Sequence, residues 1–197
     1  MDNNRVALVT GANQGIGLQI AKDLVGHGFT VLVGSRDLVN GEAAAKDIGP
    51  KAHAIQLDVT DSASIAAAAA RIEKDYGKLD VLVNNAGISK VGKPQGKVED
   101  IAQKSKLTVV PLDEVRAIYE VNVFGVIGVT QAMVPLLRKS KSGRIVNVSS
   151  GVGSLARTLS PEGEHLRQIF GAYSISKAAL NAVTVGFAIE LEKDGIK

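Results

Sequence analysis

Five short apolar runs alternate along the chain with longer segments that carry apolar residues at helical spacing. The runs are rich in β-branched residues, are bounded by Gly, Asp or Asn, and span 5–10, 30–35, 53–59, 79–85 and 143–150. Helices are expected between and after them, at about 15–27, 39–48, 61–76, 113–139 and 173–194. Near-continuous apolar runs are typical of parallel strands buried on both faces. The alternation therefore predicts an α/β fold, with a doubly wound parallel sheet and helices on both faces.

The length and composition suit one globular domain over residues 1–197. The hydrophobic fraction is 45%, and the chain has 21 glycines. Lys and Arg number 23 against 20 Asp and Glu, and the basic residues are scattered, which argues against a nucleic-acid partner. Cysteine is absent, which excludes disulfides and thiolate chemistry. The three histidines are isolated from one another, so no metal site is predicted.

The N-terminus enters a strand-like run almost at once, and no signal peptide fits there. The most apolar stretch, 121–137, is interrupted by Asn122, Gly125, Gly128 and Gln131, which disfavours a membrane span. A cytoplasmic protein without a membrane partner is therefore expected.

A glycine-rich turn lies between the first strand and the first helix. Gly11, Gly15 and Gly17 follow the spacing G-x-x-x-G-x-G, in the context of a Rossmann-like dinucleotide turn. Glycine permits the tight turn and lets backbone N–H groups approach a phosphate. Leu18 follows Gly17, so the Lys-Ser/Thr of an ATP-binding P-loop is missing. A glycine turn without a ligand stays an alternative.

The end of the second strand bears on the choice of cofactor. An acidic residue there would bind the ribose 2′-hydroxyl of NAD, whereas this chain has Ser35 and Arg36. An arginine can pair with the 2′-phosphate of NADP. The sequence thus favours NADP (NADPH) over NAD, although Arg36 could equally be a surface residue near Asp37.

Tyr173 precedes Lys177 by four residues, so both side chains share one helical face. Small residues surround the pair, which suggests that something approaches this face closely: Ala172, Ser174, Ser176, Ala178 and Ala179.

Taken together and in order, these motifs resemble those of the classical short-chain dehydrogenase/reductase family over essentially the whole chain. The matching residues are Thr10–Gly17 (TGANQGIG), Asp58 in LDVT, Asn84–Gly87 (NNAG), Asn122 in NVFG, Ser150 after IVNVS, and Tyr173 with Lys177 in YSISK.

The resemblance implies hydride transfer between a nicotinamide cofactor and a small-molecule carbonyl or alcohol. It implies a catalytic tetrad of Asn122, Ser150, Tyr173 and Lys177. Tyr173 would be the proton donor or acceptor, and the Lys177 ammonium would lower its pKa from about 10 toward neutrality. Spacing alone does not separate Ser149 from Ser150. The implied cofactor contacts are Gly11, Asn13, Gln14, Gly15, Ile16, Gly17, Arg36, Asp58, Val59, Asn85, Ala86, Gly87, Tyr173 and Lys177.

Several of these residues have plain structural alternatives. Asp58 could cap a turn, Asn84 and Asn85 could be strand-end turn residues, and Asn122 could bond backbone groups.

Two connections are long for the family, 88–111 and 154–171, and they resemble those of its carbonyl-reductase-like branch. Both are expected to line the substrate mouth. The family implies further strands after Lys197, so the chain is expected to be C-terminally incomplete and its sheet to end at the fifth strand. The oligomeric state stays open, with a homo-oligomer as one option.

Two other functions compete with a reductase. One is a catalytically inactive NADP-binding protein with a regulatory or partner-binding role, and the other is an epimerase or dehydratase of the extended relatives. The extended relatives bind NAD through an acidic residue after the second strand, which this chain lacks.

Overall fold

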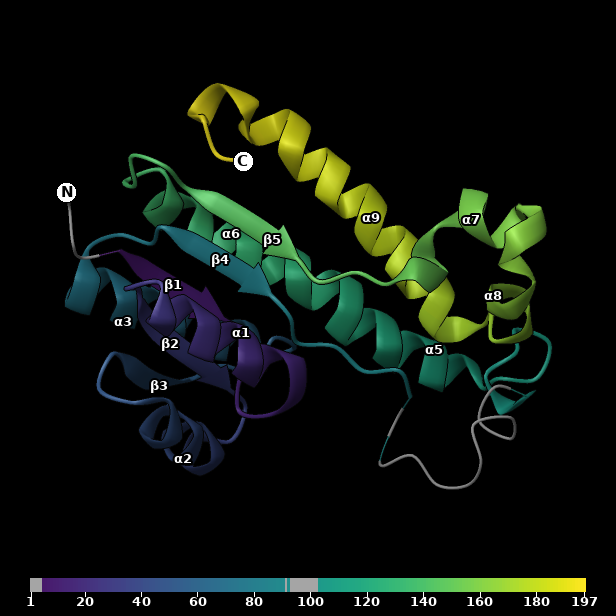
Figure 1. Cartoon of the computed structure of the whole chain (residues 1–197), viewed down its shortest axis with the longest axis horizontal. Coiled ribbons are helices and arrows are strands. Elements are labelled where there is room, and N and C mark those ends of the chain that lie inside the picture. The colour runs from purple at the N-terminus through teal and green to yellow at the C-terminus, as the bar shows by residue number, and fades with distance from the viewer. Residues whose placement is uncertain (1–4, 91, 93–102) are drawn as a thin grey trace. The chain divides into compact units, whose positions relative to one another are not determined.

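The structure of the protein is a computed structural model that describes residues 5–90, 92 and 103–197. The chain divides into two compact units (Figure 1). Unit 1 comprises 1–86, 125–148 and 187–197, and unit 2 comprises 87–124 and 149–186. Part of the long connection 88–111, which is predicted to line the substrate mouth, lies outside the described residues.

Unit 1 contains a parallel five-stranded sheet of order β3-β2-β1-β4-β5. Its strands are β1 (Val6–Val9), β2 (Thr30–Ser35), β3 (Ala52–Gln56), β4 (Val81–Asn84) and β5 (Arg144–Asn147). Neighbouring strands pair in a regular register, for example Leu8 with Leu32 and with Leu82. The predicted doubly wound, Rossmann-like sheet is confirmed, and each strand is shorter than its apolar run.

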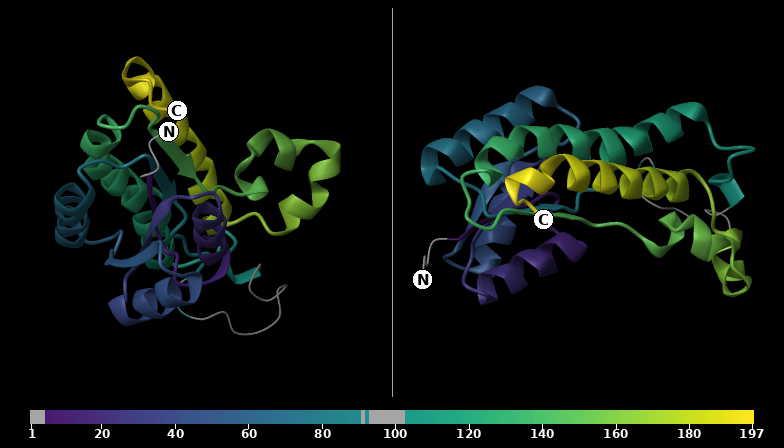
Figure 2. Two further views of the ribbon diagram at one scale, coloured as in Figure 1. Left: turned by 60° about the vertical axis from the view of Figure 1, so that its left-hand side comes forward. Right: turned by 90° about the horizontal axis from the view of Figure 1, so that it is seen from above.

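Helices pack against both faces of the sheet (Figure 2). The helices α1 (Gly15–Gly26) and α2 (Leu38–Ile48) lie on one face, and α3 (Ser62–Tyr76) and α6 (Gly125–Leu137) on the other. Side chains alternate between the faces of a strand. Accordingly, Val6 and Leu8 pack with α3 and α6, while Ala7 and Val9 pack with α1 and α2.

The last strand differs from the prediction of burial on both faces. Its residues are only half-buried or exposed, and Val146 is 47% exposed. Within the described residues, β5 has a strand neighbour, β4, on one side only. On its other side the Ile145 amide donates to the Lys197 carbonyl at 2.8 Å, and the Lys197 amide donates to the Gly143 carbonyl at 3.1 Å. An edge strand buries less side-chain surface than a central one, which accounts for the exposure.

One helix expected over 113–139 is interrupted. It forms as α5 (Leu112–Tyr119), a π-helical turn at Glu120–Phe124, and α6. Asn122 lies in the π-helical turn, where its side chain is fully buried. π-Helical turns are frequent at functional sites, and this one could not be predicted from apolar periodicity.

Unit 2 also holds α7 (Leu155–Leu159), α8 (Glu164–Gln168) and two short 3-10 turns at Gly151–Gly153 and Pro161–Gly163. The long helix α9 (Ala172–Leu191) begins in unit 2, and its residues 187–191 belong to unit 1. A final 3-10 turn spans Glu192–Asp194.

Two helical stretches, Leu112–Leu137 and Ala172–Asp194, are long and apolar enough to cross a bilayer by length and composition alone. Core helices of soluble proteins pass the same test, and Val129 and Met133 of the first stretch are fully buried in the core of unit 1. The absence of a membrane partner stays a prediction.

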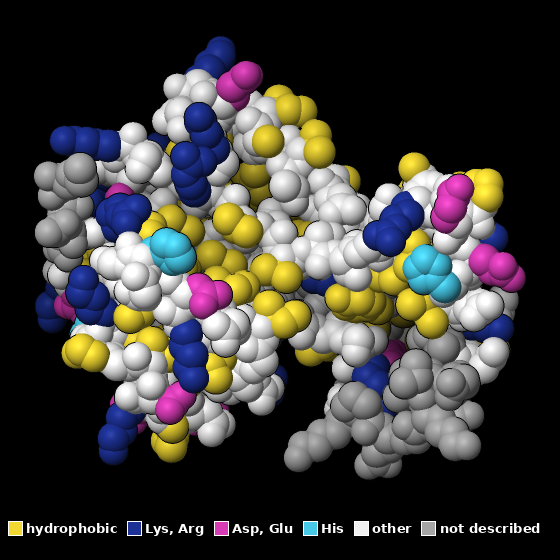
Figure 3. All heavy atoms as spheres, viewed as in Figure 1, with side chains coloured by type: hydrophobic (Ala, Val, Ile, Leu, Met, Phe, Trp, Pro, Cys, Tyr) yellow, Lys and Arg dark blue, Asp and Glu magenta, His cyan; other side chains and the backbone are white. Residues whose placement is uncertain are grey.

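On the face drawn in Figure 3, the Lys and Arg side chains of the described residues alternate with Asp and Glu and form no broad basic patch. This distribution agrees with the scattered basic residues of the sequence, whose net charge is +3.

Candidate active site

In unit 1 the glycine turn is fixed by the end of β4. The Thr10 hydroxyl accepts hydrogen bonds from the Asn85 amide at 3.0 Å and the Ala86 amide at 2.9 Å. The Asn85 side-chain amide donates in turn to the carbonyls of Thr10 at 2.9 Å and Gly11 at 3.1 Å. Two motifs 75 positions apart thus form one structure. Thr10 is 1% exposed, and its role as the link was not predicted.

The glycines of this turn are required for two different reasons. Gly11 and Gly15 have φ of 61° and 59°, a region that side-chain-bearing residues rarely adopt. Gly17 has ordinary backbone angles but no room for a side chain. A Cβ there would overlap the Asn85 side-chain amide and lie 2.5 Å from the Gly11 carbonyl oxygen. The spacing of the motif therefore identified all three glycines, but not that two are required by their backbone angles and the third by lack of space.

The start of α1 leaves backbone donors for a ligand. Gln14 is the N-cap residue, and its side chain makes no capping hydrogen bond. Gly15 has no atom within 4 Å of a built Cβ, so the space beside it is open. Asn13 is half-buried, while Gln14 and Ile16 are exposed. An uncapped helix start beside open space suits an anionic group such as a phosphate.

Asp58, Asn84 and Asn85 resolve into separate roles. The Asp58 carboxylate accepts from the Thr60 amide at 2.9 Å and the Thr60 hydroxyl at 2.7 Å, so it does hold a turn, as its structural alternative proposed. Asn84 is buried and bonds Thr130 and Asn147 inside unit 1. Asn85 alone of the two asparagines contacts the glycine turn. Val59, next to Asp58, packs against the core.

Arg36 is exposed at the end of β2. Its presumed neighbour Asp37 is the N-cap residue of α2 and accepts from the Asn40 amide at 3.2 Å. Among the described residues, Arg36 forms no ion pair.

In unit 2 the two serines after β5 separate clearly. The Ser149 hydroxyl donates to the Asn181 side-chain oxygen at 2.6 Å. The Ser150 hydroxyl instead interacts with the Tyr173 phenol and lowers the pKa of that phenol. The different partners of the two serines make a distinction that spacing left open.

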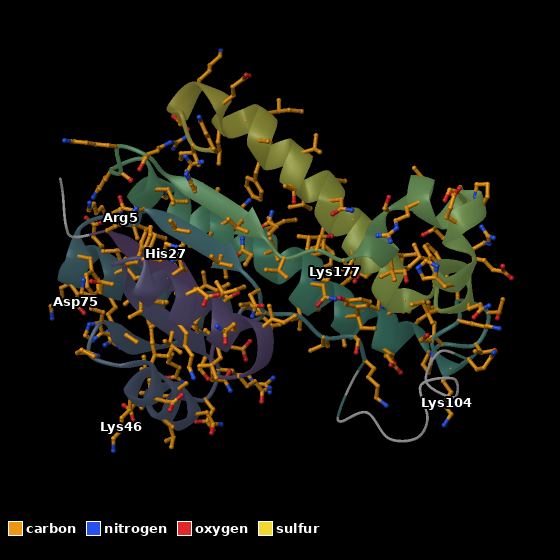
Figure 4. All side chains as sticks on the ribbon, in the orientation of Figure 1. Arg5, His27, Lys46, Asp75, Lys104 and Lys177 are labelled. Carbon is orange, nitrogen blue, oxygen red and sulfur yellow. The ribbon has the colours of Figure 1, made fainter. Side chains whose placement is uncertain are left out.

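Tyr173 and Lys177 lie one turn apart on α9, where Figure 4 labels the lysine. The Lys177 nitrogen lies 5.7 Å from the centre of the Tyr173 ring, over its face. Lys177 is only 4% exposed, and Tyr173 is half-buried. The predicted pairing on one helical face is present in the structure.

The pKa of Tyr173 shifts in the direction opposite to the expected one. Burial of the phenol raises its pKa above 10, and the interaction with Ser150 lowers it by less. Burial also lowers the pKa of Lys177 itself. The expected lowering of the Tyr173 pKa by Lys177 is therefore not found in this structure.

Asn122 connects two segments of unit 2. Its side-chain oxygen accepts from the Ile88 amide at 2.8 Å, and its side-chain nitrogen donates to the Ile88 carbonyl at 2.8 Å. The same nitrogen donates to the Ser176 hydroxyl at 3.0 Å. The side chain therefore does bond backbone, and it fixes the segment that follows the exposed Gly87. Ser176, which sequence reasoning counted only as small, links Asn122 to α9.

The small residues around the pair have a different explanation from the one expected. Ala172, Ser174 and Ser176 are at most 1% exposed and face the protein's own chain. The Ala172 amide donates to the Ser105 carbonyl at 3.1 Å, and the Ser174 hydroxyl accepts from the Gly171 amide at 3.4 Å. Close packing of unit 2 thus accounts for these three, while Ala178 and Ala179 stay half-buried.

Fold and site define a Rossmann-like α/β protein with a glycine turn and a Ser–Tyr–Lys group. Residues 5–197 match the family described as short chain dehydrogenase, and the chain belongs to this family. It is accordingly an enzyme of the dehydrogenase/reductase class, whose members use nicotinamide cofactors.

Three similar proteins illustrate the relationship. The chain is 36% identical to the short-chain dehydrogenase anuI of Penicillium roqueforti, over 97% of this chain and 74% of the relative. A 3-ketoacyl-(acyl-carrier-protein) reductase of Brucella melitensis, solved with NADH, is 31% identical with a TM-score of 0.80 and covers 98% of this chain and 72% of its own. A gluconate 5-dehydrogenase of Burkholderia cenocepacia, solved with NADP and tartrate, is 28% identical with a TM-score of 0.78. This match covers 98% of this chain and 68% of the dehydrogenase.

Proposed function

We propose that the chain transfers a hydride between NADPH and a small-molecule carbonyl or alcohol, with Tyr173 as the proton donor and acceptor. The observation that carries this proposal is the position of the buried Lys177 nitrogen, 5.7 Å from the centre of the Tyr173 ring on the same face of α9. A bound nicotinamide would supply the hydride and, when oxidised, a positive charge near the phenol.

The proton chemistry follows from the state of the phenol. Negative charge builds on a carbonyl oxygen as hydride reaches its carbon, and a positioned acid must supply a proton there. The raised pKa keeps Tyr173 protonated near neutral pH, which is the form that a proton donor needs. Ser150 would donate a hydrogen bond to the substrate oxygen, and Lys177 would contact the nicotinamide ribose. Asn122 would act by fixing the segment after Gly87 and by its bond to Ser176.

The NADPH preference rests on unit 1. The uncapped start of α1 offers backbone donors to the phosphates. Arg36 offers a charge to the 2′-phosphate, since Asp37 is occupied in capping α2. Asp58, Val59, Asn85, Ala86 and Gly87 would complete the cofactor contacts. Relatives of this fold were solved with either cofactor, so the preference is a property to be measured on this chain.

The connection 154–171 would border the substrate mouth, as in the carbonyl-reductase-like branch. It exposes Leu155 by 55%, Leu159 by 78% and Ile169 by 43%. Such side chains would favour an apolar carbonyl compound. A cytoplasmic location, the lack of nucleic-acid and membrane partners, and the oligomeric state stay predictions.

Fluorescence titration with NADPH, and with NADH in parallel, tests the cofactor. Tighter binding of NADPH is expected, and Arg36→Ala should weaken it by about 10- to 100-fold because a charge-assisted hydrogen bond contributes roughly 1.5–3 kcal/mol. Arg36→Ala should leave NADH binding unchanged. Arg71→Ala is the control, since it removes an exposed arginine of the same unit that pairs with Asp75 on α3. Equal loss for both cofactors would contradict the role of Arg36.

A further inference from the structure

The loop after β5 is attached to α9 on both sides of Ser150. Before Ser150, the Ser149 hydroxyl donates to the side-chain oxygen of Asn181 at 2.6 Å. After it, the side-chain nitrogen of Asn181 donates to the Gly153 carbonyl at 3.2 Å. One side chain thus bonds residues 149 and 153, with Ser150 between them.

Asn181 lies on the same helical face as the tyrosine and the lysine. It follows Lys177 by four residues and Tyr173 by eight, which is one and two turns of α9. The loop that it bonds therefore runs along the helix face that carries the Tyr–Lys pair.

Gly153 brings the loop against this face. A Cβ on Gly153 would lie 2.7 Å from the Lys177 carbonyl carbon and 2.9 Å from its Cβ. Only a glycine allows such an approach, so the backbone of the loop rests directly on the turn of α9 that holds Lys177. The loop is thereby located along the helix by packing and by two hydrogen bonds.

We propose that Asn181 is a positioning residue for the reaction, which holds the 149–153 loop so that the Ser150 hydroxyl stays on the Tyr173 phenol. The inference rests on the function proposed above. Asparagine suits the task because it has one acceptor oxygen for the Ser149 hydroxyl and donor N–H groups for the Gly153 carbonyl. Aspartate would keep the acceptor and lose the donor, and alanine would lose both.

Substitution of Asn181 should lower the reaction rate more than it lowers the stability of the fold. Ser149 is exposed and Asn181 is half-buried, so each hydrogen bond adds little to the stability of the fold. A shift of a catalytic group by about 1 Å can nevertheless cost about 100-fold in rate.

The first readout needs neither substrate nor cofactor. A fluorotyrosine placed at position 173 has a more acidic phenol than tyrosine, and fluorine NMR follows its titration while the fold is intact. Ser150→Ala should raise the phenol pKa, because it removes the hydroxyl that lowers it. Asn181→Ala, Asn181→Asp and Ser149→Ala should raise it in the same direction, and Ser149→Thr, which keeps the hydroxyl, should restore the native value. Thr184→Ala is the matched control on α9, since it removes a side-chain bond to the Leu180 carbonyl, and it should leave the pKa unchanged.

The second readout is kinetic and uses the full chain with NADPH and a panel of carbonyl compounds. Asn181→Ala should lower kcat by about 10- to 100-fold and leave the Kd of NADPH unchanged. The Ser149→Ala and Asn181→Ala losses should not add in the double variant. Unfolding midpoints close to the native value show that the fold persists.

The outcomes separate the two proposals. A native pKa in Asn181→Ala beside a raised pKa in Ser150→Ala overturns the positioning role and leaves the proposed function in place. A second outcome is a raised pKa in Asn181→Ala, Asn181→Asp and Ser149→Ala, without turnover by the native chain. This outcome supports the positioning of Ser150 and counts against the proposed reaction. A native pKa in Ser150→Ala overturns the positioning role together with the interaction between Ser150 and the phenol.

Discussion

The glycine turn of unit 1 and the Tyr–Lys face of α9 in unit 2 are built on opposite requirements. The turn at 10–17 depends on atoms that are missing, since a Cβ on Gly17 would overlap Asn85 and the Gly11 carbonyl. The face at 173–181 depends on atoms that are present: a phenol, an ammonium and the amide of Asn181. The glycine turn should therefore be disrupted when atoms are added, and the α9 face should lose its function when atoms are removed.

The two regions also differ in how each is held. The side chains of Thr10 and Asn85 fix the turn through bonds to backbone amides and carbonyls, so the turn tolerates little change of shape. Around α9, bonds between two side chains contribute as well, from Asn122 to Ser176 and from Ser149 to Asn181. Losing Asn181 should alter the chemistry more than the fold.

The largest effect is expected from Tyr173→Phe, which removes one oxygen from the α9 face. Turnover should fall by about 1,000-fold or more, because general acid catalysis is lost. NADPH affinity and the unfolding midpoint should stay close to native. Steady-state assays beside a fluorescence titration check this, and a variant that keeps near-native turnover would exclude Tyr173 as the proton donor. Full cofactor binding without turnover in the native chain would instead favour the inactive NADP-binding alternative.

Gly17→Ala tests the opposite requirement by adding one carbon to the turn. The overlap should lower the free energy of unfolding by about 3 kcal/mol, near the upper end of the usual cost of overpacking, and weaken NADPH binding. Gly26→Ala at the end of the same helix is the control, because its Cβ would meet nothing within 4 Å. Denaturant melts compare the two, and equal stabilities would refute the packing argument.

Asn122→Ala should lower the free energy of unfolding by about 2 kcal/mol. The Ile88 amide and carbonyl would both lose their partner, and an unsatisfied buried polar group costs about 1–3 kcal/mol. Asn122→Asp keeps the acceptor for the Ile88 amide and should lose less. Urea denaturation of both variants measures the difference, and a larger loss in the aspartate variant would count against this ranking.

The smallest effect concerns alkaline stability. A folded-state pKa raised above 10 gives Tyr173 a contribution to stability that is full below pH 10 and is lost as the pH rises through the folded value. Tyr173→Phe should therefore reduce the loss of stability above pH 10. Tyr76, whose pKa burial also raises, is the comparison in unit 1, and Tyr76→Phe should act in the same direction. Denaturation at pH 8 and above pH 10 checks the sign, and an increased alkaline loss in either variant would contradict it.

Much of the fold could be predicted because it depends on local patterns. The apolar runs gave all five strands in order, and helical spacing gave the helices that flank them, with ends that differ by a few residues. The π-helical turn around Asn122 and the exposure of β5 were missed, since one depends on a contact with Ile88 and the other on position in the sheet.

The site was predictable only in part. The Tyr173–Lys177 pair follows from helical geometry alone. The choice of Ser150 over Ser149, and the roles of Thr10, Ser176 and Asn181, depend on contacts between residues far apart in the sequence. Spacing carries no information on which loop folds onto which helix. The pKa of Tyr173 was mispredicted because burial of the phenol raises it.

Transfer of deuterium from NADPH labelled at C4 to a carbonyl compound tests the central claim most directly. The chain would be incubated with the labelled cofactor and a panel of aliphatic ketones, quinones, steroids, sugars and 3-oxoacyl thioesters. Mass spectrometry would then measure the deuterium content of the products. We predict deuterium on the former carbonyl carbon with the native chain and none with Tyr173→Phe at equal NADPH occupancy. Equal transfer by both proteins would contradict the assignment of Tyr173 as the proton donor.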